Sequence, residues 1–233
     1  MRLDNISIEY AGTGKLAVAD VSLSLGQGEK LALLGPSGCG KSSILNAVLG
    51  LLDKSVARVS GSVSVAPGKV SAVFGRPALF PWFSVASNVA FPLTVAGAGP
   101  EAGRKVADLL KMGGLAASAG YLPLQLSAGM QQRVSFLRAL ASTPELILMD
   151  EPFSSLDVKT KEGLIKDFLS ILAESGASLL FVTHDIREAL AMGDRILILG
   201  SSPARCRNEY RLKGLSAAER AELIPLIAAE YEE

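Results

Sequence analysis

The feature that most constrains the fold of this chain is a glycine-rich loop between an apolar strand and a helix. Leu31 to Leu34 form a continuous apolar run, which is typical of a strand buried on both faces of a parallel sheet. Residues 35–42 follow at once and match the pattern G-x-x-x-x-G-K-[ST]. A helix-like run from Ser42 to Leu52 comes next. This strand–loop–helix unit predicts an α/β fold with a parallel sheet.

The same loop predicts a phosphate site. Glycines let successive backbone N–H groups turn toward one anion, and the following helix points its positive end at the same place. Lys41 is expected to reach the β- and γ-phosphates, and the Ser42 hydroxyl to ligate Mg²⁺. A chance glycine-rich turn is the alternative, but the flanking strand and helix argue against it. The loop alone does not separate transporters from GTPases or nucleotide kinases. The residues expected to bind the nucleotide are Gly35, Pro36, Ser37, Gly38, Cys39, Gly40, Lys41 and Ser42.

Two carboxylates end a second apolar strand. Leu146 to Met149 lead directly into Asp150 and Glu151. Asp150 is placed to hold Mg²⁺ through water. Glu151 points to the other side of the strand, where a carboxylate could orient or deprotonate an attacking water. Taken alone, the pair could be solvated acids at a strand end, but the phosphate loop in the same chain favours a catalytic role.

The chain has one histidine, His184, directly after a third apolar strand that ends at Val182 and Thr183. Open α/β sheets place their chemistry at the carboxyl ends of strands. We therefore expect His184 to hydrogen-bond the γ-phosphate and the attacking water. A single histidine is often incidental or structural, and this position weakens that alternative.

Bulk composition excludes several classes of protein. The chain has 23 basic and 23 acidic residues, whereas a general nucleic-acid binder usually carries a basic excess. Two cysteines suggest no disulfide framework and favour a reducing, cytoplasmic setting. The charged N-terminus predicts no signal peptide, and no apolar run approaches the roughly 20 residues of a membrane span. We expect any membrane association to come through a partner.

The order of further motifs resembles the ATP-binding cassette (ABC) family over about Leu3 to Arg205. Residues 126–133 read LSAGMQQR and resemble the ABC signature, usually LSGGQ, with its QR continuation. Residues 152–157 look like the D-loop, and His184 matches the switch histidine. Tyr10 falls where the family places an aromatic ring against adenine.

This resemblance implies an ATPase that forms a head-to-tail homodimer. Each ATP would lie between the phosphate loop of one subunit and Ser127 and Gly129 of the other, at a helix N-terminus that offers N–H donors. Ser127 is equally suited to be a simple helix N-cap, and both roles can coexist. The implied partners are integral membrane permease subunits, with a solute-binding protein and no nucleic acid. The implied location is the cytoplasmic face of the inner or cell membrane, reached through the permease.

A narrower resemblance concerns residues 76–82, which read RPALFPW, together with Asn88 and Val89. This pattern is similar to the nitrate, sulfonate and taurine class of importers. Phe80, Trp82 and Phe83 would either touch the coupling helix of a permease or fill the core of a helical lobe. The transported solute is not encoded in such a subunit, since the permease and the binding protein select it.

The chain departs from the family pattern at Gly75, where the family carries a glutamine that contacts Mg²⁺ and water and links two lobes. Glycine offers no side chain there and loosens the hinge. We expect Gly75 to lower hydrolysis or its coupling to transport without abolishing ATP binding. Ala128 and Met130 also replace the usual signature residues.

Two alternatives remain within the family. One is an ATPase of DNA repair or translation, which would carry coiled-coil or zinc insertions or a second cassette. The other is a regulatory subunit with little turnover, which only Gly75 supports.

The predicted fold class is α/β, a P-loop NTPase RecA-like core with an N-terminal antiparallel β-subdomain and an inserted helical subdomain. Alternating Ile6, Ile8 and Tyr10 indicate the antiparallel sheet, and Pro67-Gly68 between valine-rich runs signals a hairpin. The expected organisation is a single ABC ATPase domain over residues 1–233. Its predicted parts are a core (1–75 and 143–205), a helical subdomain with the signature motif (76–142) and a helical tail (206–233).

Overall fold

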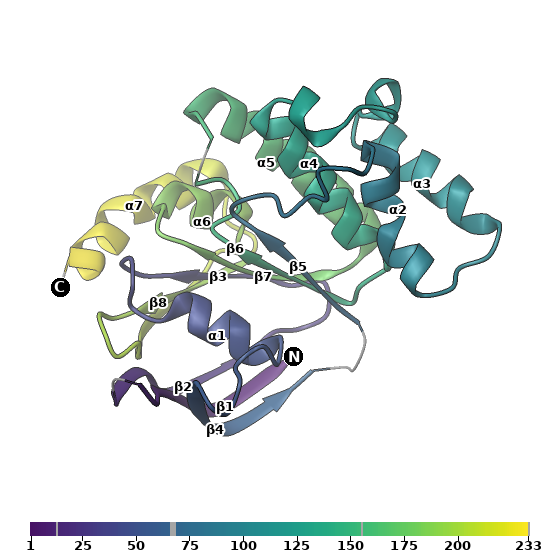
Figure 1. Cartoon of the computed structure of the whole chain (residues 1–233). Helices are drawn as coiled ribbons and strands as arrows, with labels where there is room; N and C mark the ends of the chain where they lie inside the picture. The colour runs from purple at the N-terminus through teal and green to yellow at the C-terminus, as the bar shows by residue number, and fades with distance from the viewer. Residues whose placement is uncertain (13, 66–68, 155, 233) are drawn as a thin grey trace. The chain divides into compact units, whose positions relative to one another are not determined.

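The computed structural model describes the whole chain apart from residues 13, 66–68, 155 and 233 (Figure 1). The chain divides into two compact units. The first comprises Met1–Gly68 and Ser178–Glu233, and the second comprises Lys69–Ala177. The first unit therefore carries the phosphate loop and His184, and the second carries the two acidic residues and the signature motif. Each unit is described by itself.

A three-stranded antiparallel sheet begins the first unit, in the order β2-β1-β4. Its strands are β1 (Arg2–Tyr10), β2 (Lys15–Ser24) and β4 (Ala57–Ser64). Leu3, Ile6 and Ile8 on β1 are buried, and a register irregularity between Leu3 and Ile6 keeps all three on one covered face. The predicted N-terminal antiparallel sheet is confirmed.

The same unit contains a parallel arrangement around β3 (Lys30–Leu34). β3 pairs in parallel with β7 (Ser178–Thr183) on one side and with β8 (Arg195–Leu199) on the other. β9 (Cys206–Arg211) adds an antiparallel edge to β8. Leu34 is the register partner of Thr183, so the phosphate loop and the turn that carries His184 leave neighbouring strands at the same edge. The helices of this unit are α1 (Lys41–Val48), α6 (Ile186–Met192) and α7 (Ala217–Glu232).

The second unit combines a pair of parallel strands with the helical part of the chain. β5 (Val70–Phe74) pairs with β6 (Leu146–Asp150), and Phe74 is the register partner of Asp150. The α-helices are α2 (Val85–Val95), α3 (Glu101–Met112), α4 (Ala128–Ala141) and α5 (Val158–Ser175). Two 3-10 turns, Ala116–Ser118 and Pro123–Gln125, lie between α3 and α4. Helix α4 packs against α2, α3, α5 and β5 and is the centre of this unit.

Three details differ from the sequence-based expectations. The hairpin across Pro67-Gly68 is wrong, because β4 pairs with β1 and β5 pairs with β6; residues 67 and 68 themselves lie outside the described residues. A proline–glycine pair signals a local chain reversal, but the strand partner is chosen by the buried apolar surface it offers. Residues 206–211, counted with the helical tail, form β9 instead. Helix α1 ends at Val48, before Leu52, and Gly50 adopts a φ of 67° just beyond it.

Among the described residues, no helix combines the length and the apolar character that a membrane crossing requires.

An aromatic cluster holds α4 and α5 of the second unit together. The Phe168 ring lies 3.9 Å from that of Phe136 and 6.5 Å from that of Phe153, measured between centroids. All three side chains are buried.

Replacing Phe168 by alanine would leave a cavity in this cluster, so we expect the free energy of unfolding to fall by about 3–5 kcal/mol. Denaturant titration followed by circular dichroism measures the change. Leu124→Ala is the matched control, because Leu124 is 88% exposed and its loss should change the free energy of unfolding by less than about 0.5 kcal/mol. Equal effects of the two substitutions would contradict the assignment of the cluster as core.

Candidate functional site

The phosphate loop has a left-handed backbone, which favours glycine, at two of its positions. Gly38 has a φ of 76° and Gly40 a φ of 123°. A Cβ on Gly40 would lie 2.5 Å from the carbonyl oxygen of Ala17, so no other residue fits there. Gly40 is also the N-cap of α1 and supplies no side-chain cap to its first N–H groups. The geometry therefore leaves a helix N-terminus available to an anion.

Lys41 lies beneath this loop and is only 4% exposed. Its ammonium donates hydrogen bonds to the carbonyl oxygens of Gly35 at 2.7 Å and Pro36 at 2.8 Å. A buried ammonium needs such partners, because transfer from water is costly without them. The loop thus holds the cation in place through its own backbone.

The other predicted residues of the loop divide into exposed and buried groups. Ser37, Gly38 and Ser42 are exposed, whereas Gly35 and Cys39 are buried. Burial raises the pKa of the Cys39 thiol, although the nearby Lys41 opposes this shift. A buried thiol with a raised pKa is a poor nucleophile, which fits a packing role for Cys39 in the loop.

Tyr10 lies at the end of β1, and its hydroxyl is 2.9 Å from the Ser43 hydroxyl on α1. This contact connects the predicted adenine-stacking residue with the helix that follows the phosphate loop. Both residues belong to the first unit, so the pairing fixes the tyrosine relative to the loop.

His184 is exposed on a turn whose backbone is held by its neighbours. The Asp185 carboxylate accepts from the N–H groups of Arg187 and Glu188 and so caps α6. The Thr183 hydroxyl donates to the buried Glu188 carboxylate at 2.6 Å and accepts from the Asp185 N–H. Sequence reasoning did not assign these supporting roles, although a Thr-His-Asp run before a helix carries an N-cap signal.

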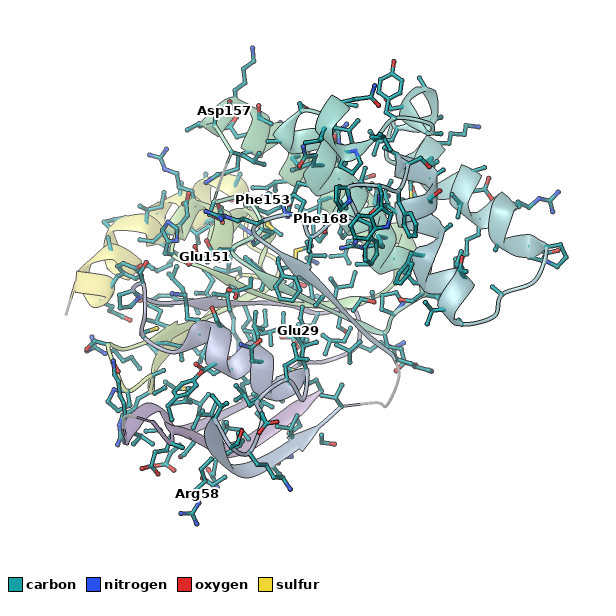
Figure 2. All side chains as sticks on the ribbon, viewed as in Figure 1. Glu29, Arg58, Glu151, Phe153, Asp157 and Phe168 are labelled. Atoms are coloured by element: carbon teal, nitrogen blue, oxygen red, sulfur yellow. The ribbon has the colours of Figure 1, made fainter. Side chains whose placement is uncertain are left out.

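Asp150 and Glu151 lie at the end of β6 in the second unit, where Figure 2 labels Glu151. Glu151 has a φ of 47°, a left-handed conformation that is unfavourable for a side chain of this kind. The backbone N–H and the hydroxyl of Ser154 both donate to the Glu151 carbonyl oxygen and stabilise this turn. Strained backbone of this type is often found at functional sites.

The predicted D-loop continues from this turn. Asp157 caps α5 by accepting from the Thr160 N–H at 3.0 Å, and hydrogen bonds from Thr160 lower the pKa of the Asp157 carboxyl. Ser155 lies outside the described residues.

Gly75 follows β5 beside these two acids. A Cβ at this position would lie 2.7 Å from the carbonyl oxygen of Glu151 and 3.2 Å from that of Asp150. Any side chain at residue 75 therefore requires the Glu151 turn to move. A glutamine amide does reach this strand end from elsewhere, since Gln132 on α4 donates to the carbonyl of Phe74 at 3.2 Å.

The signature motif begins α4, as its helix-capping pattern indicates. The Ser127 hydroxyl accepts from the Met130 N–H at 3.3 Å and is the N-cap. Ser127 and Ala128 are exposed and Gly129 is buried. A Cβ on Gly129 would lie 3.0 Å from the Thr160 methyl carbon, so close packing against α5 explains the glycine.

Oxygen ligands of the kind that Mg²⁺ prefers occur in each unit, at Ser42 in the first and at Asp150 in the second. The described residues contain no group of three or more His, Cys, Asp or Glu side chains that could hold a metal ion. Mg²⁺ in nucleotide sites commonly takes one or two protein oxygens, with phosphate oxygens and waters as its other ligands. The Ser42 hydroxyl and the Asp150 carboxylate offer oxygens of that kind.

The fold and these motifs define a class of nucleotide-dependent ATPase, and comparison with known proteins identifies the family. The family model described as ABC transporter matches residues 18–154, and the chain belongs to this family. The P-loop NTPase fold predicted from the sequence is confirmed by a solved dimer of the ATP-binding cassette MJ0796 bound to ADP and phosphate. That structure aligns with a TM-score of 0.73 and 31% identity, over 92% of this chain and 99% of the other.

Named relatives match nearly the whole chain. The taurine import ATP-binding protein TauB of Ruegeria pomeroyi is 37% identical over 96% of this chain and 86% of its own length. The aliphatic sulfonates import ATP-binding protein SsuB 1 of Pseudomonas savastanoi pv. phaseolicola is 42% identical over 97% and 92%. The resemblance to the sulfonate and taurine class of importers is thereby confirmed.

Two substitutions at Gly75 distinguish the effect of crowding against Glu151 from the effect of lacking the glutamine amide that the family carries there. Gly75→Ala adds only the Cβ that approaches Glu151, so we expect a loss of about 1–3 kcal/mol in stability and a lower turnover of ATP. Gly75→Gln adds the same Cβ together with an amide. If the missing amide limits hydrolysis, the turnover of Gly75→Gln exceeds that of Gly75→Ala. Steady-state phosphate release and thermal unfolding measure both effects. A glutamine variant no faster than the alanine variant would contradict the hypothesis about the amide.

Proposed function

We propose that this chain binds and hydrolyses ATP to power solute import through a separate membrane permease, in the manner of taurine and aliphatic sulfonate importers. The observation that carries the proposal is the phosphate loop, with its left-handed glycines, its open helix N-terminus and its buried Lys41. The named import ATP-binding proteins, similar over most of the chain, support the direction of transport.

The proposed roles in the site follow from residue chemistry. Lys41 and the loop N–H groups of residues 35–42 would bind the phosphates, with Tyr10 against the adenine. Ser42 and Asp150 would hold Mg²⁺, which neutralises phosphate charge when bound. Glu151 would orient or deprotonate the attacking water, and His184 would donate to the γ-phosphate. Catalysis of this kind depends on positioning and electrostatic stabilisation, for which the capped turn of His184 and the braced turn of Glu151 are suited.

A dimer completes the proposed site. Ser127 and Gly129 of one subunit would bind the γ-phosphate held by the phosphate loop of the other, in a head-to-tail arrangement. The exposed Ser127 hydroxyl at the N-terminus of α4 supports this role, because a helix N-terminus attracts anions. Ser127 caps the helix as well, so the two roles coexist. The similar MJ0796 cassette is dimeric with bound ADP and phosphate.

We also place the chain on the cytoplasmic face of the membrane, bound through permease subunits that work with a solute-binding protein. The best candidate for the permease contact is Trp82, which is 70% exposed. The nearby Phe80, Phe83 and Phe91 pack against one another, with Phe80 and Phe91 centroids 4.6 Å apart. These three rings are half-buried, and the Trp82 ring packs against Phe80 and Phe83 while most of its own surface remains exposed.

Asn88 holds this aromatic segment rigidly. Its buried amide accepts from the Phe80 N–H and donates to the carbonyls of Phe80, Phe83 and Ser84. A rigid loop that carries an exposed tryptophan loses little conformational entropy on binding, which favours a docking role.

Lys41→Ala and Glu151→Gln test the proposed ATPase. Loss of the ammonium should abolish ATP binding. Loss of the Glu151 carboxylate should keep binding but lower phosphate release about 10²–10⁴-fold, and the variant should accumulate as an ATP-bound dimer. Nucleotide titration, phosphate release and size-exclusion chromatography with ATP measure these outcomes. Glu162→Gln, an exposed position on α5, is the matched control. Phosphate release by Glu151→Gln at the wild-type rate would contradict the proposed role of Glu151 in activating the attacking water.

Trp82→Ala tests the proposed permease contact. Removal of a central aromatic from an interface commonly costs about 2 kcal/mol or more. We therefore expect the affinity for the permease, measured by the permease concentration that half-maximally stimulates ATPase activity, to fall about thirtyfold or more. Basal ATPase activity should not change. Val95→Ala is the control, because Val95 is 72% exposed at the end of α2. Permease binding unaffected by Trp82→Ala would rule out the contact.

A further inference from the structure

The last helix of the chain, α7, is attached to the first unit near its beginning by Arg220. The guanidinium donates to the carbonyl oxygens of Leu190 at 2.6 Å and Gly193 at 3.0 Å, and to that of Leu212 at 3.2 Å. The first two carbonyls belong to the end of α6, where a positive charge is favourable. Helix α7 is therefore docked against the end of α6.

A second set of contacts holds the far end of α7. The Glu230 carboxylate accepts from the Asn208 amide at 2.8 Å and from the Tyr210 hydroxyl at 2.6 Å, both on β9. Burial, followed by the hydrogen bond to Glu230 and its charge, raises the pKa of Tyr210 to about 12. Ile227, one turn earlier, is completely buried. The last turn of the helix thus has a defined position.

From this turn, Tyr231 reaches the phosphate loop. Its hydroxyl donates to the carbonyl oxygen of Gly35 at 3.0 Å, across 196 positions in the sequence. Figure 1 shows the end of α7 on the same side of the first unit as the loop between β3 and α1. The same carbonyl accepts from the Lys41 ammonium at 2.7 Å. Tyr231 and Lys41 therefore share one buried acceptor at the first residue of the loop.

Nucleotide binding would change this shared contact. When the Lys41 ammonium turns to the phosphates, its hydrogen bond to Gly35 weakens or breaks, and the Tyr231 hydroxyl remains as a donor to that carbonyl. Gly35 lies in close packing with β8, because a Cβ added there would lie 2.9 Å from the carbonyl oxygen of Leu199. A buried carbonyl without a donor is costly, and that cost would fall on the nucleotide-bound state.

We propose that Tyr231 is a positioning residue for nucleotide binding, which keeps the Gly35 carbonyl hydrogen-bonded while Lys41 is engaged with phosphate. Helix α7 then forms part of the nucleotide site through the loop, without touching the nucleotide. This inference rests on the proposed ATP-binding role of the loop.

Tyr231→Phe tests the inference, because it removes one hydroxyl and keeps the ring. In the nucleotide-free protein Lys41 still satisfies Gly35, so we expect the melting temperature to change by less than about 2 °C. The affinity for a fluorescent ATP analogue should fall about tenfold, as expected for an unsatisfied buried acceptor. In steady state, KM for ATP should rise by a similar factor, while kcat at saturating ATP stays within about twofold. Tyr121→Phe, at an exposed tyrosine of the second unit, is the control and should leave affinity unchanged.

The outcomes separate this inference from the proposed function. Wild-type affinity in Lys41→Ala would refute the ATP-binding role of the loop. Loss of affinity in Lys41→Ala, with wild-type affinity in Tyr231→Phe, would overturn the role of Tyr231 alone. Tighter binding by Tyr231→Phe would overturn it too, because the contact would then restrain the loop. A fall of more than about 5 °C in the melting temperature of the nucleotide-free variant would assign Tyr231 to stability instead.

Discussion

The first unit depends on the burial of β3 between two parallel partners. Leu31 to Leu34 are completely buried, and β7 and β8 supply backbone hydrogen bonds on both sides. A central strand of this kind cannot slip in register without exposing apolar side chains and breaking two ladders. The phosphate loop begins at the fixed end of this strand, and the His184 turn begins at the same level of β7. The buried strand β3 therefore fixes the position of the phosphate loop directly and that of the His184 turn through its pairing with β7.

Local residue types made much of this arrangement predictable. Gly38 and Gly40 occupy left-handed backbone, Ser127 and Asp157 cap helices, and the apolar run at residues 146–149 is a buried strand, all of which are short-range preferences. Contacts between distant segments were not predictable. Tyr231 reaches Gly35 because α7 is docked by Arg220 and Glu230, and no local pattern encodes that docking. The partner of β5 likewise depends on which apolar strand lies beside it. The catalytic roles of Asp150, Glu151 and His184 remain predictions.

At the acidic end of β6, the Glu151 turn and a side chain at residue 75 would need the same space. Glu151 adopts a left-handed backbone, and its carbonyl occupies the space that a Cβ of residue 75 would need. Glycine at position 75 is thus consistent with the tight turn at Glu151, and a side chain there would require that turn to move. The Gln132 amide, bonded to the Phe74 carbonyl, attaches the signature helix to the same strand end. Glycine at position 75 therefore departs from the family pattern and also avoids a clash with the Glu151 carbonyl.

The exposed indole of Trp82 has a spectroscopic consequence. Trp82 is the only tryptophan among the 233 residues, so the intrinsic emission of the protein excited at its red edge comes from one ring. Because this ring is largely in water, its emission lies at long wavelength, and transfer to an apolar interface shifts it toward the blue. The unlabelled protein consequently carries its own optical reporter on the face where we place the permease.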